Sequence, residues 1–373
     1  HLLRRQSTTM RVCTVSHRFG GFDGVAVEAS KWDRAYARLG WSVTHAAGRF
    51  DNPVNPDTDT VVAGLWADIR GGVPPKPDYA LIDELVGTHD LLVLENVGCY
   101  PSAALAAHAF EEAALRQGIS TIVRHHDPAW QVTSWPAATS DCFPLHNPAM
   151  LHLTINRMTE DQFRRRYPDL DTREAIDTDH PMVDFAATTR GDRDGTRSRL
   201  GVHRDDILLA HPARNAARKN IPAALDLAAN LATRTTRRVH YWLTSAQGPI
   251  GPTPPEVRVH RGNVANVADL YAAADFIVFP SLWEGWGLPV MESATARKLI
   301  ATHPFPALAE IHALGITTID HRDHDAIMRL IDDPTRYREL TDSNHHSARV
   351  LDISRLPDNV AAHARRAWEL MAA

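Results

Sequence analysis

Two series of short apolar runs, each alternating with segments of helical spacing, constrain the fold of this chain most. The first series includes residues 11–16, 91–94 and 119–123, and the second begins at 207–210. Short apolar runs bounded by glycine or polar residues are typical of buried strands. Strands that alternate with helices predict a parallel sheet with helices on both faces. The sequence therefore predicts an α/β protein with one doubly wound sheet in each series.

Length and a polar segment predict two domains. A chain of 373 residues exceeds what one hydrophobic core usually fills. Residues 184–199 are charged and lack apolar periodicity, so we place a polar hinge and the domain boundary there. We expect an extension over residues 1–9, an N-terminal Rossmann-like domain over 10–190, a C-terminal one over 191–355, and a terminal helix over 356–373 that could pack back on the N-terminal domain.

Composition limits which binding partners and which cellular compartment we expect for this chain. The formal net charge of −5 provides no footprint for nucleic acid, so we expect no nucleic-acid partner. No apolar run reaches the roughly 18 residues of a membrane span, so no integral membrane segment is expected. Cys13, Cys99 and Cys142 are odd in number and widely spaced, which favours a reduced, cytoplasmic setting. The oligomeric state stays open.

One strand of the second series, Phe276–Phe279, leads through a glycine-spaced loop into a helix that we expect to begin at Pro289. Glu284 lies in the loop, and Glu292 is expected in the first turn of the helix. Amide groups that open a helix attract phosphate, and carboxylates accept hydrogen bonds from sugar hydroxyls. The pattern favours a nucleotide-sugar site over the alternative of two solvated acids, one complementing the helix dipole.

A basic loop follows the strand at 207–210. Arg214 and Lys219 lie in this loop with four residues between them. Two fixed cations at the end of a strand can neutralise a departing diphosphate. The alternative is a solvated basic loop, but lysine is scarce in this chain, which favours a function for Lys219. Arg218 is expected to face solvent.

Residues 280–292 resemble the paired-glutamate signature of retaining GT-B glycosyltransferases of family four, the glycosyl transferases group 1. The resemblance implies two Rossmann-like doubly wound domains facing a cleft, the GT-B fold. It implies that Glu284 holds the transferred sugar, that Glu292 holds the ribose, and that Arg214 and Lys219 bind the diphosphate. The donor-binding loop would consist of Gly285, Trp286, Gly287 and Leu288.

The first series contains a weaker match to the same family. The strand at 119–123 leads into a step that resembles the family's His-Asp motif, which implies that His126 lies near the sugar, with His125 as its rival and Asp127 on the acceptor side. The glycine loop at 19–24 resembles the family's first loop, so Gly21 is expected to approach the donor. Trp130 and Trp135 could stack on a sugar or lie in the core.

The sequence also departs from the family pattern. Arg297 and Leu299 stand where members usually have Gly and Pro, Phe305 precedes a later glutamate where Gly-Gly is usual, and Ala213 replaces a glycine. These changes leave the donor sugar open. Several Asp-x-Asp pairs could imitate a metal site, but their polar surroundings favour turns. They are 57/59, 169/171, 177/179, 192/194 and 323/325.

We therefore expect a retaining glycosyltransferase that moves a hexose from a UDP- or GDP-linked donor to a hydroxyl acceptor. The expected catalytic residues are Glu284, His126, Arg214 and Lys219. No metal and no cofactor other than the donor substrate is expected. Two alternatives stay open: a GT-B epimerase or phosphorylase, and a catalytically silent module that binds a nucleotide sugar.

Overall fold

The computed structural model describes residues 9–21, 23–66, 75–99, 101–131 and 143–373. They divide into two compact units, unit 1 up to residue 181 together with 354–373, and unit 2 from 182 to 353. Trp135, Cys142 and residues 1–8 of the predicted extension lie outside the described residues. Within the described part of the chain, we find no helix with the length and apolar character needed to cross a bilayer.

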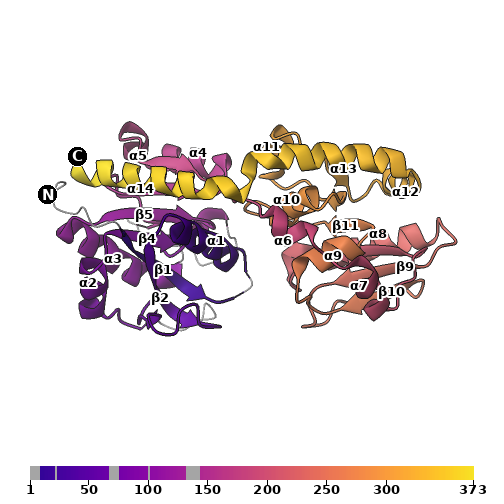
Figure 1. The fold of residues 1–373 in the computed structure, drawn as a ribbon, viewed down its shortest axis with the longest axis horizontal. Helices are drawn as coiled ribbons and strands as arrows, with labels where there is room; N and C mark the ends of the chain where they lie inside the picture. Colours follow the sequence, from indigo (N-terminus) through magenta and orange to yellow (C-terminus); the bar gives the residue numbers. More distant parts are fainter. Residues whose placement is uncertain (1–8, 22, 67–74, 100, 132–142) are drawn as a thin grey trace. The chain divides into compact units, whose positions relative to one another are not determined.

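Unit 1 is built on a seven-stranded sheet in the order β3-β2-β1-β4-β5-β6-β7, in which every neighbouring pair is parallel (Figure 1). The strands are β1 (Arg11–Phe19), β2 (Ser42–Phe50), β3 (Thr60–Val61), β4 (Leu91–Glu95), β5 (Ser120–His125), β6 (Leu151–Thr154) and β7 (Ile176–Thr178). The α-helices are α1 (Gly24–Arg38), α2 (Tyr79–Gly87), α3 (Ala104–Gln117), α4 (Arg157–Arg166), α5 (Pro168–Thr172) and α14 (Leu356–Ala372), and α14 packs against α1 and β5.

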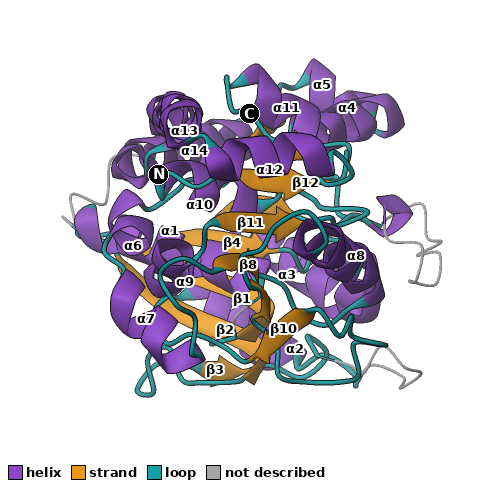
Figure 2. Cartoon of the chain, turned by 90° about the vertical axis from the view of Figure 1, so that its right-hand side faces the viewer, coloured by secondary structure: helices purple, strands orange, loops and turns teal. Residues whose placement is uncertain are grey.

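Unit 2 contains a six-stranded parallel sheet in the order β10-β9-β8-β11-β12-β13. The strands are β8 (Ile207–His211), β9 (Val239–Leu243), β10 (Val257–Arg261), β11 (Phe276–Phe279), β12 (Ile300–Thr302) and β13 (Ile319–Asp320). The α-helices are α6 (Phe185–Thr189), α7 (Arg193–Leu200), α8 (Ile221–Ala232), α9 (Val267–Ala273), α10 (Leu288–Thr295), α11 (Leu308–Ala313), α12 (His324–Asp332) and α13 (Pro334–Ala348). Figure 2 shows α8 on one side of this sheet and α7 and α9 on the other.

The predicted α/β architecture with two parallel sheets is confirmed. All residues of β4, β8 and β11 are buried, as expected for strands that carry helices on both faces. The apolar core of unit 2 lies between β8, β9 and β11 on one side and α8 on the other. The short runs in the sequence are therefore apolar because both faces of each strand are covered.

The segment predicted to be a polar hinge instead forms helices α6 and α7. The carboxylates of Asp184 and Asp192 cap their amino ends by accepting backbone N–H groups. Arg193 and Arg197 of α7 donate to the carboxylate of Asp275, which anchors the helix on unit 2. Apolar periodicity missed this segment because buried ion pairs, rather than an apolar stripe, attach α7.

The order of strands places a switch point in each sheet. The sequence order reverses between β1 and β4 in unit 1 and between β8 and β11 in unit 2. In open parallel sheets, the loops that leave the carboxyl ends of the two strands at this point form a crevice that binds ligands. In unit 2 these loops are the basic loop after β8 and the glycine loop after β11, which is where the candidate site is found.

Candidate active site

Lys219 and Glu284 meet at the switch point of unit 2. The ammonium nitrogen Nζ of Lys219 lies 2.5 Å from Oε1 of Glu284, and both residues are 8% exposed. Arg218 places Nη1 at 2.9 Å from the same oxygen and donates to the carbonyl oxygen of Trp283. The expectation that Arg218 only faces solvent is therefore wrong. Its guanidinium is partly exposed but joins the two loops.

Burial controls the charge of Lys219. Desolvation lowers the pKa of Lys219 to about 8, while the Glu284 carboxylate opposes this shift and the charges of Arg218 and Arg214 add to it. The ammonium also lies 4.8 Å from the centroid of the Phe279 ring, a favourable cation–π position. Arg214 is exposed, but its charge acts on Lys219. Lys219 and Arg218 thus contact Glu284 directly, and Arg214 lies close enough to Lys219 for its charge to act on that ammonium.

The glycine loop ends in a sharp turn that opens α10. Gly287 is the residue before the helix and has φ +94°, a conformation that favours glycine. A Cβ at this position would lie 2.8 Å from Cζ of Phe305. Among the described residues, no side chain caps this end of α10, and backbone N–H groups in the first turn of such a helix attract anions. Phe305, which replaces a family glycine, supports the turn from beneath.

Glu292 lies in the second turn of α10, not in the first. The helix begins at Leu288, so Pro289 occupies its second position. The carboxylate of Glu292 accepts a 2.6 Å hydrogen bond from the hydroxyl of Tyr271, a buried residue of α9. Sequence reasoning missed Tyr271, because its place in an apolar helix pattern indicates only core packing.

In unit 1, His126 follows β5 and lies against the end of β4. Its Nε2 lies 2.5 Å from Oε1 of the fully buried Glu95. The side chain of Asn96, a residue with φ +63°, accepts hydrogen bonds from the backbone N–H groups of His126 and Asp127. Neither Glu95 nor Asn96 was predicted, although an acid that ends an apolar strand was the available signal.

His125 belongs to the core of unit 1. It is fully buried, and its Nε2 lies 2.9 Å from Nδ1 of His152, with which its ring stacks. Burial and the neighbouring histidines hold the pKa of His125 well below its usual value, so this imidazole is neutral. The two histidines therefore separate by position: His126 pairs with a carboxylate, whereas His125 packs inside.

Arg124 fixes the acid that holds His126. It is 2% exposed, its Nη1 lies 2.6 Å from Oε2 of Glu95, and its guanidinium lies 4.2 Å from the ring centroid of Trp32. Burial works against the charge of Glu95, but Arg124 and His126 outweigh it and keep the pKa of Glu95 below its usual value. Asp179, buried beside Arg124, forms a second ion pair with it at 3.7 Å. It is thus not an aspartate in a polar turn.

The first loop of unit 1 requires glycine at Gly20. This residue has φ +73°, and a Cβ there would lie 2.0 Å from the carbonyl oxygen of Asn52. Gly21 is partly exposed, and the Asp23 carboxylate that follows it caps α1 by accepting the N–H groups of Val25 and Ala26. Arg18 pairs with Asp23. Because β1 extends to Phe19, that residue lies in the strand rather than in the loop predicted at 19–24.

The remaining candidates have mainly structural roles. Trp130 donates to Gln162 and packs edge-on against Phe163. In four of the Asp-x-Asp pairs, an aspartate accepts backbone N–H groups: Asp59 in a turn, Asp177 within β7, and Asp192 and Asp323 as helix caps. Asp59, Asp192 and Asp323 match the predicted chemistry of turns and caps.

Solved structures similar to this chain indicate its fold class, and a family model matches part of its second unit. WaaG, a glycosyltransferase involved in lipopolysaccharide biosynthesis, shares 15% identity at a TM-score of 0.68, covering 94% of this chain and 98% of that one. Anabaena Alr3699/HepE, solved with UDP and glucose, shares 14% identity at a TM-score of 0.70, covering 95% and 98%. The two sheets thus define the GT-B fold. Residues 218–333 match the family model of glycosyl transferases group 1, and this match supports a GT-B glycosyltransferase of that group.

Curated relatives agree with this assignment. The mannosylglucosylglycerate synthase of Thermotoga maritima is 22% identical over 431 residues, covering 94% of this chain and 98% of the relative. The D-inositol 3-phosphate glycosyltransferase 1 of Catenulispora acidiphila is 26% identical over 227 residues, covering 52% of this chain and 53% of the relative. The matched region begins at Arg218 and includes Lys219, Glu284 and Glu292.

Proposed function

We propose that this glycosyltransferase moves a hexose from a UDP- or GDP-linked sugar to a hydroxyl acceptor, with retention at the anomeric carbon and without a metal ion. The observation that carries the proposal is the contact between Lys219 and Glu284 at the switch point of unit 2. A cation and a carboxylate at one crevice match the two ends of a sugar diphosphate. The cation suits the diphosphate, and the carboxylate suits the sugar hydroxyls.

The donor would replace the contact between the two side chains. In this picture, the diphosphate takes the ammonium of Lys219 and a hydroxyl of the sugar donates to Glu284. Arg214 and the first-turn amides of α10 add positive potential where charge develops on the departing diphosphate. Preorganised donors of this kind contribute about 3 kcal/mol each to lowering a barrier. Protein cations would thus do the work of a metal ion.

Glu292 would anchor the ribose of the nucleotide. Its carboxylate is already oriented by the hydroxyl of Tyr271, and a carboxylate can accept several hydrogen bonds at once. An oriented acceptor costs less conformational entropy on binding than a free one. Tyr271 is therefore a positioning residue in this proposal.

His126 would hydrogen-bond the sugar or the acceptor. The short contact with Glu95 sets the orientation of its imidazole, and Asn96 fixes the backbone beneath it. Gly21 and Asp127 lie in the loops that follow β1 and β5, and we propose donor and acceptor contacts for them. Alr3699/HepE, one of the structural neighbours, was solved with UDP-glucose, which supports a nucleotide-sugar donor here.

The test is a panel of UDP- and GDP-sugars combined with hydroxyl acceptors. Nucleotide release that requires acceptor, a product with the anomeric configuration of the donor by NMR, and activity in excess EDTA would support the proposal. Interconversion of donor sugars without acceptor would instead favour an epimerase, and release driven by inorganic phosphate a phosphorylase. Tight binding of a nucleotide sugar with no turnover on any acceptor would favour a silent module.

A further inference from the structure

A pocket of unit 2 lies at the end of its strands opposite to Lys219 and Glu284. It has a volume of about 460 Å³. Arg237 precedes β9, Asp275 precedes β11, and Lys298 precedes β12, so the pocket is at the amino ends of these strands. The candidate active site lies at the carboxyl ends. The two sites are therefore separate places on one domain.

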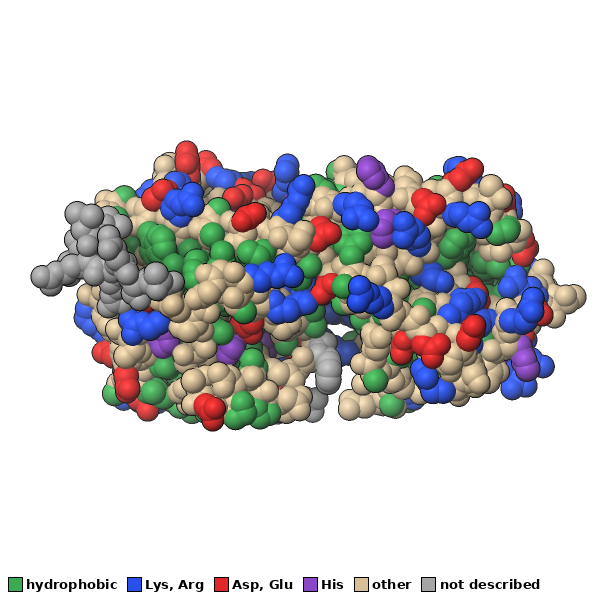
Figure 3. All heavy atoms as spheres, in the orientation of Figure 1, with side chains coloured by type: hydrophobic (Ala, Val, Ile, Leu, Met, Phe, Trp, Pro, Cys, Tyr) green, Lys and Arg blue, Asp and Glu red, His purple; other side chains and the backbone are tan. Residues whose placement is uncertain are grey.

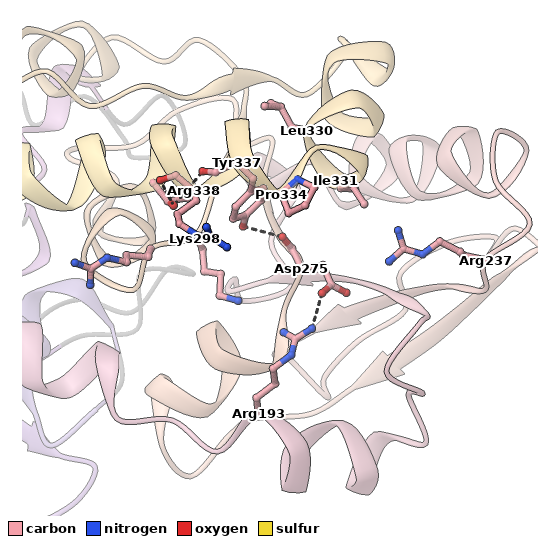
Figure 4. Close-up of a pocket in the computed structure, with 11 residues that line it drawn as sticks. Arg193, Arg237, Asp275, Lys298, Leu330, Ile331, Pro334, Tyr337 and Arg338 are labelled. Atoms are coloured by element: carbon pink, nitrogen blue, oxygen red, sulfur yellow. Dashed lines mark hydrogen bonds and ion pairs between the residues drawn. The ribbon is translucent and has the colours of Figure 1, made fainter.

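Positive charge dominates this cationic pocket, whose lining includes Arg193, Arg237, Arg297, Lys298 and Arg338 with Asp275 as the one carboxylate. Arg193 donates to Asp275 at 2.7 Å, and Arg197 donates to the same carboxylate from outside the lining. Figure 4 shows Arg193 directed at Asp275, with Tyr337 reaching the same residue from α13. The single acid is thus already shared by two guanidinium groups.

The surroundings of Lys298 are buried and positively charged. Its ammonium donates to the carbonyl oxygen of Ala274 at 2.7 Å, at the end of α9. Burial first, and then the charge of Arg193, lower the pKa of Lys298 to about 8, whereas Asp275 opposes the shift. The cation is therefore held in partly desolvated, positive surroundings, where a bound anion would be stabilising.

The opposite wall provides a free cation and an apolar surface. Arg338 of α13 is exposed, and its guanidinium forms no hydrogen bond or ion pair with any other described residue. Ile331 and Pro334 line the same wall, as does Tyr337, whose hydroxyl donates to the carbonyl oxygen of Asp275. A ligand with one anionic end and one carbon-rich end would match this division of the walls.

We propose that the cationic pocket binds a small phosphomonoester, with its phosphate between Lys298 and Arg338 and its carbon part against Pro334 and Ile331. A phosphate dianion suits several guanidinium and ammonium donors, since charge-assisted hydrogen bonds to phosphate are about twice as strong as neutral ones. The pocket volume is within the range of small-ligand sites. The site would sense an organic phosphate independently of the donor.

Phenyl phosphate is a suitable probe for the full chain. We expect saturable binding by calorimetry and reduced hydrogen–deuterium exchange over residues 328–341, with no change over 212–220. Arg338→Ala should weaken binding about tenfold, whereas Arg336→Ala should leave it unchanged. Arg336 is a matched control because it is an exposed arginine of the same helix that pairs with Glu339 and does not line the pocket.

Lys219→Ala should also leave binding of phenyl phosphate unchanged, because Lys219 lies at the opposite end of the strands from the cationic pocket. Absence of saturable binding of phenyl phosphate at millimolar concentration would overturn the proposal. It is also overturned by binding that Lys219→Ala removes and Arg338→Ala retains. Equal effects of Arg336→Ala and Arg338→Ala would overturn it as well, because they would indicate nonspecific attraction to the basic surface of α13.

Discussion

The ammonium of Lys219 lies 2.5 Å from the carboxylate of Glu284, so the two loops at the switch point of unit 2 are joined by an ion pair. A lysine and a glutamate that are this buried stabilise each other, because each would otherwise be a desolvated, unpaired charge. Both groups are also the proposed contacts of the donor. The pair therefore orders the two loops with the same charges that the donor would use.

Removal of either partner should reduce turnover. We expect Lys219→Ala and Glu284→Ala each to lower kcat by about tenfold or more, since each would lose a contact with the donor. The double variant should lose less than the product of the two single effects, because the partners act as a unit. Steady-state kinetics of the four proteins checks this. Unchanged rates in both single variants would refute the site assignment.

The activity should depend on the charge of Lys219. With its pKa lowered to about 8 by burial, Lys219 is charged below pH 8 and becomes neutral above it. We expect kcat/KM for the donor to fall as pH rises through about 8, and Lys219→Arg to retain its own kcat/KM to higher pH because guanidinium stays charged. Lys298 titrates in the same range, so Lys298→Arg is the control. If the fall in kcat/KM disappears in Lys298→Arg and persists in Lys219→Arg, the titrating group is Lys298 and not Lys219.

Tyr271→Phe should weaken donor binding without changing the chemistry. The variant removes the 2.6 Å hydrogen bond to Glu292 but keeps the ring in the core. Losing one hydrogen bond to a charged group corresponds to about 1.5 to 3 kcal/mol at most, so KM for the donor should rise about tenfold with kcat nearly constant. A fall in kcat at constant KM would place Glu292 in the chemical step instead.

Glu95→Gln should destabilise unit 1. The substitution removes the shortest ion pair of the buried Arg124 and leaves only its longer ones to Asp179 and Glu28, which we expect to cost about 3 kcal/mol in the free energy of unfolding. The pKa of Glu95 is lower in the folded state than in the unfolded state. The stability that its carboxylate contributes is therefore complete at pH values above the unfolded-state pKa and is lost as pH falls through the folded-state pKa. Urea unfolding between about pH 3 and 6 should therefore show a shallower pH dependence in the variant. Equal slopes would contradict the assignment.

Arg297→Gly should stabilise unit 2. Arg297 has φ +53°, a left-handed conformation that costs a non-glycine residue about 1 kcal/mol. Its ion pair with Asp342 is half-exposed and contributes little. We expect Tm to rise in Arg297→Gly and to fall or stay constant in Arg297→Ala, which loses the ion pair but keeps the strain. Thermal unfolding of the two variants separates these effects.

On the face drawn in Figure 3, basic and acidic side chains are interspersed over both units. The net charge of the sequence alone could not show this arrangement, and neither could it locate the cationic pocket. That pocket is formed by residues from distant parts of unit 2, which come together only at the amino ends of its strands. Local basic regions depend on topology because residues far apart in sequence become neighbours.

The sequence by itself determined the α/β alternation and singled out the central candidate residues. Apolar runs located β8 and β11, the glycine-spaced loop indicated Glu284, and the basic loop after β8 indicated Lys219. These features are local, and the fold follows from patterns within about 15 residues.

Only the tertiary structure decided which groups meet. Glu95 is one acid among many until β4 and β5 pair and bring it to His126, 31 residues away along the chain. Tyr271 likewise reaches Glu292 only because α9 packs against β8 and α10 against the neighbouring β11. Contacts between neighbouring strands and helices depend on register and packing, which a single sequence does not encode locally.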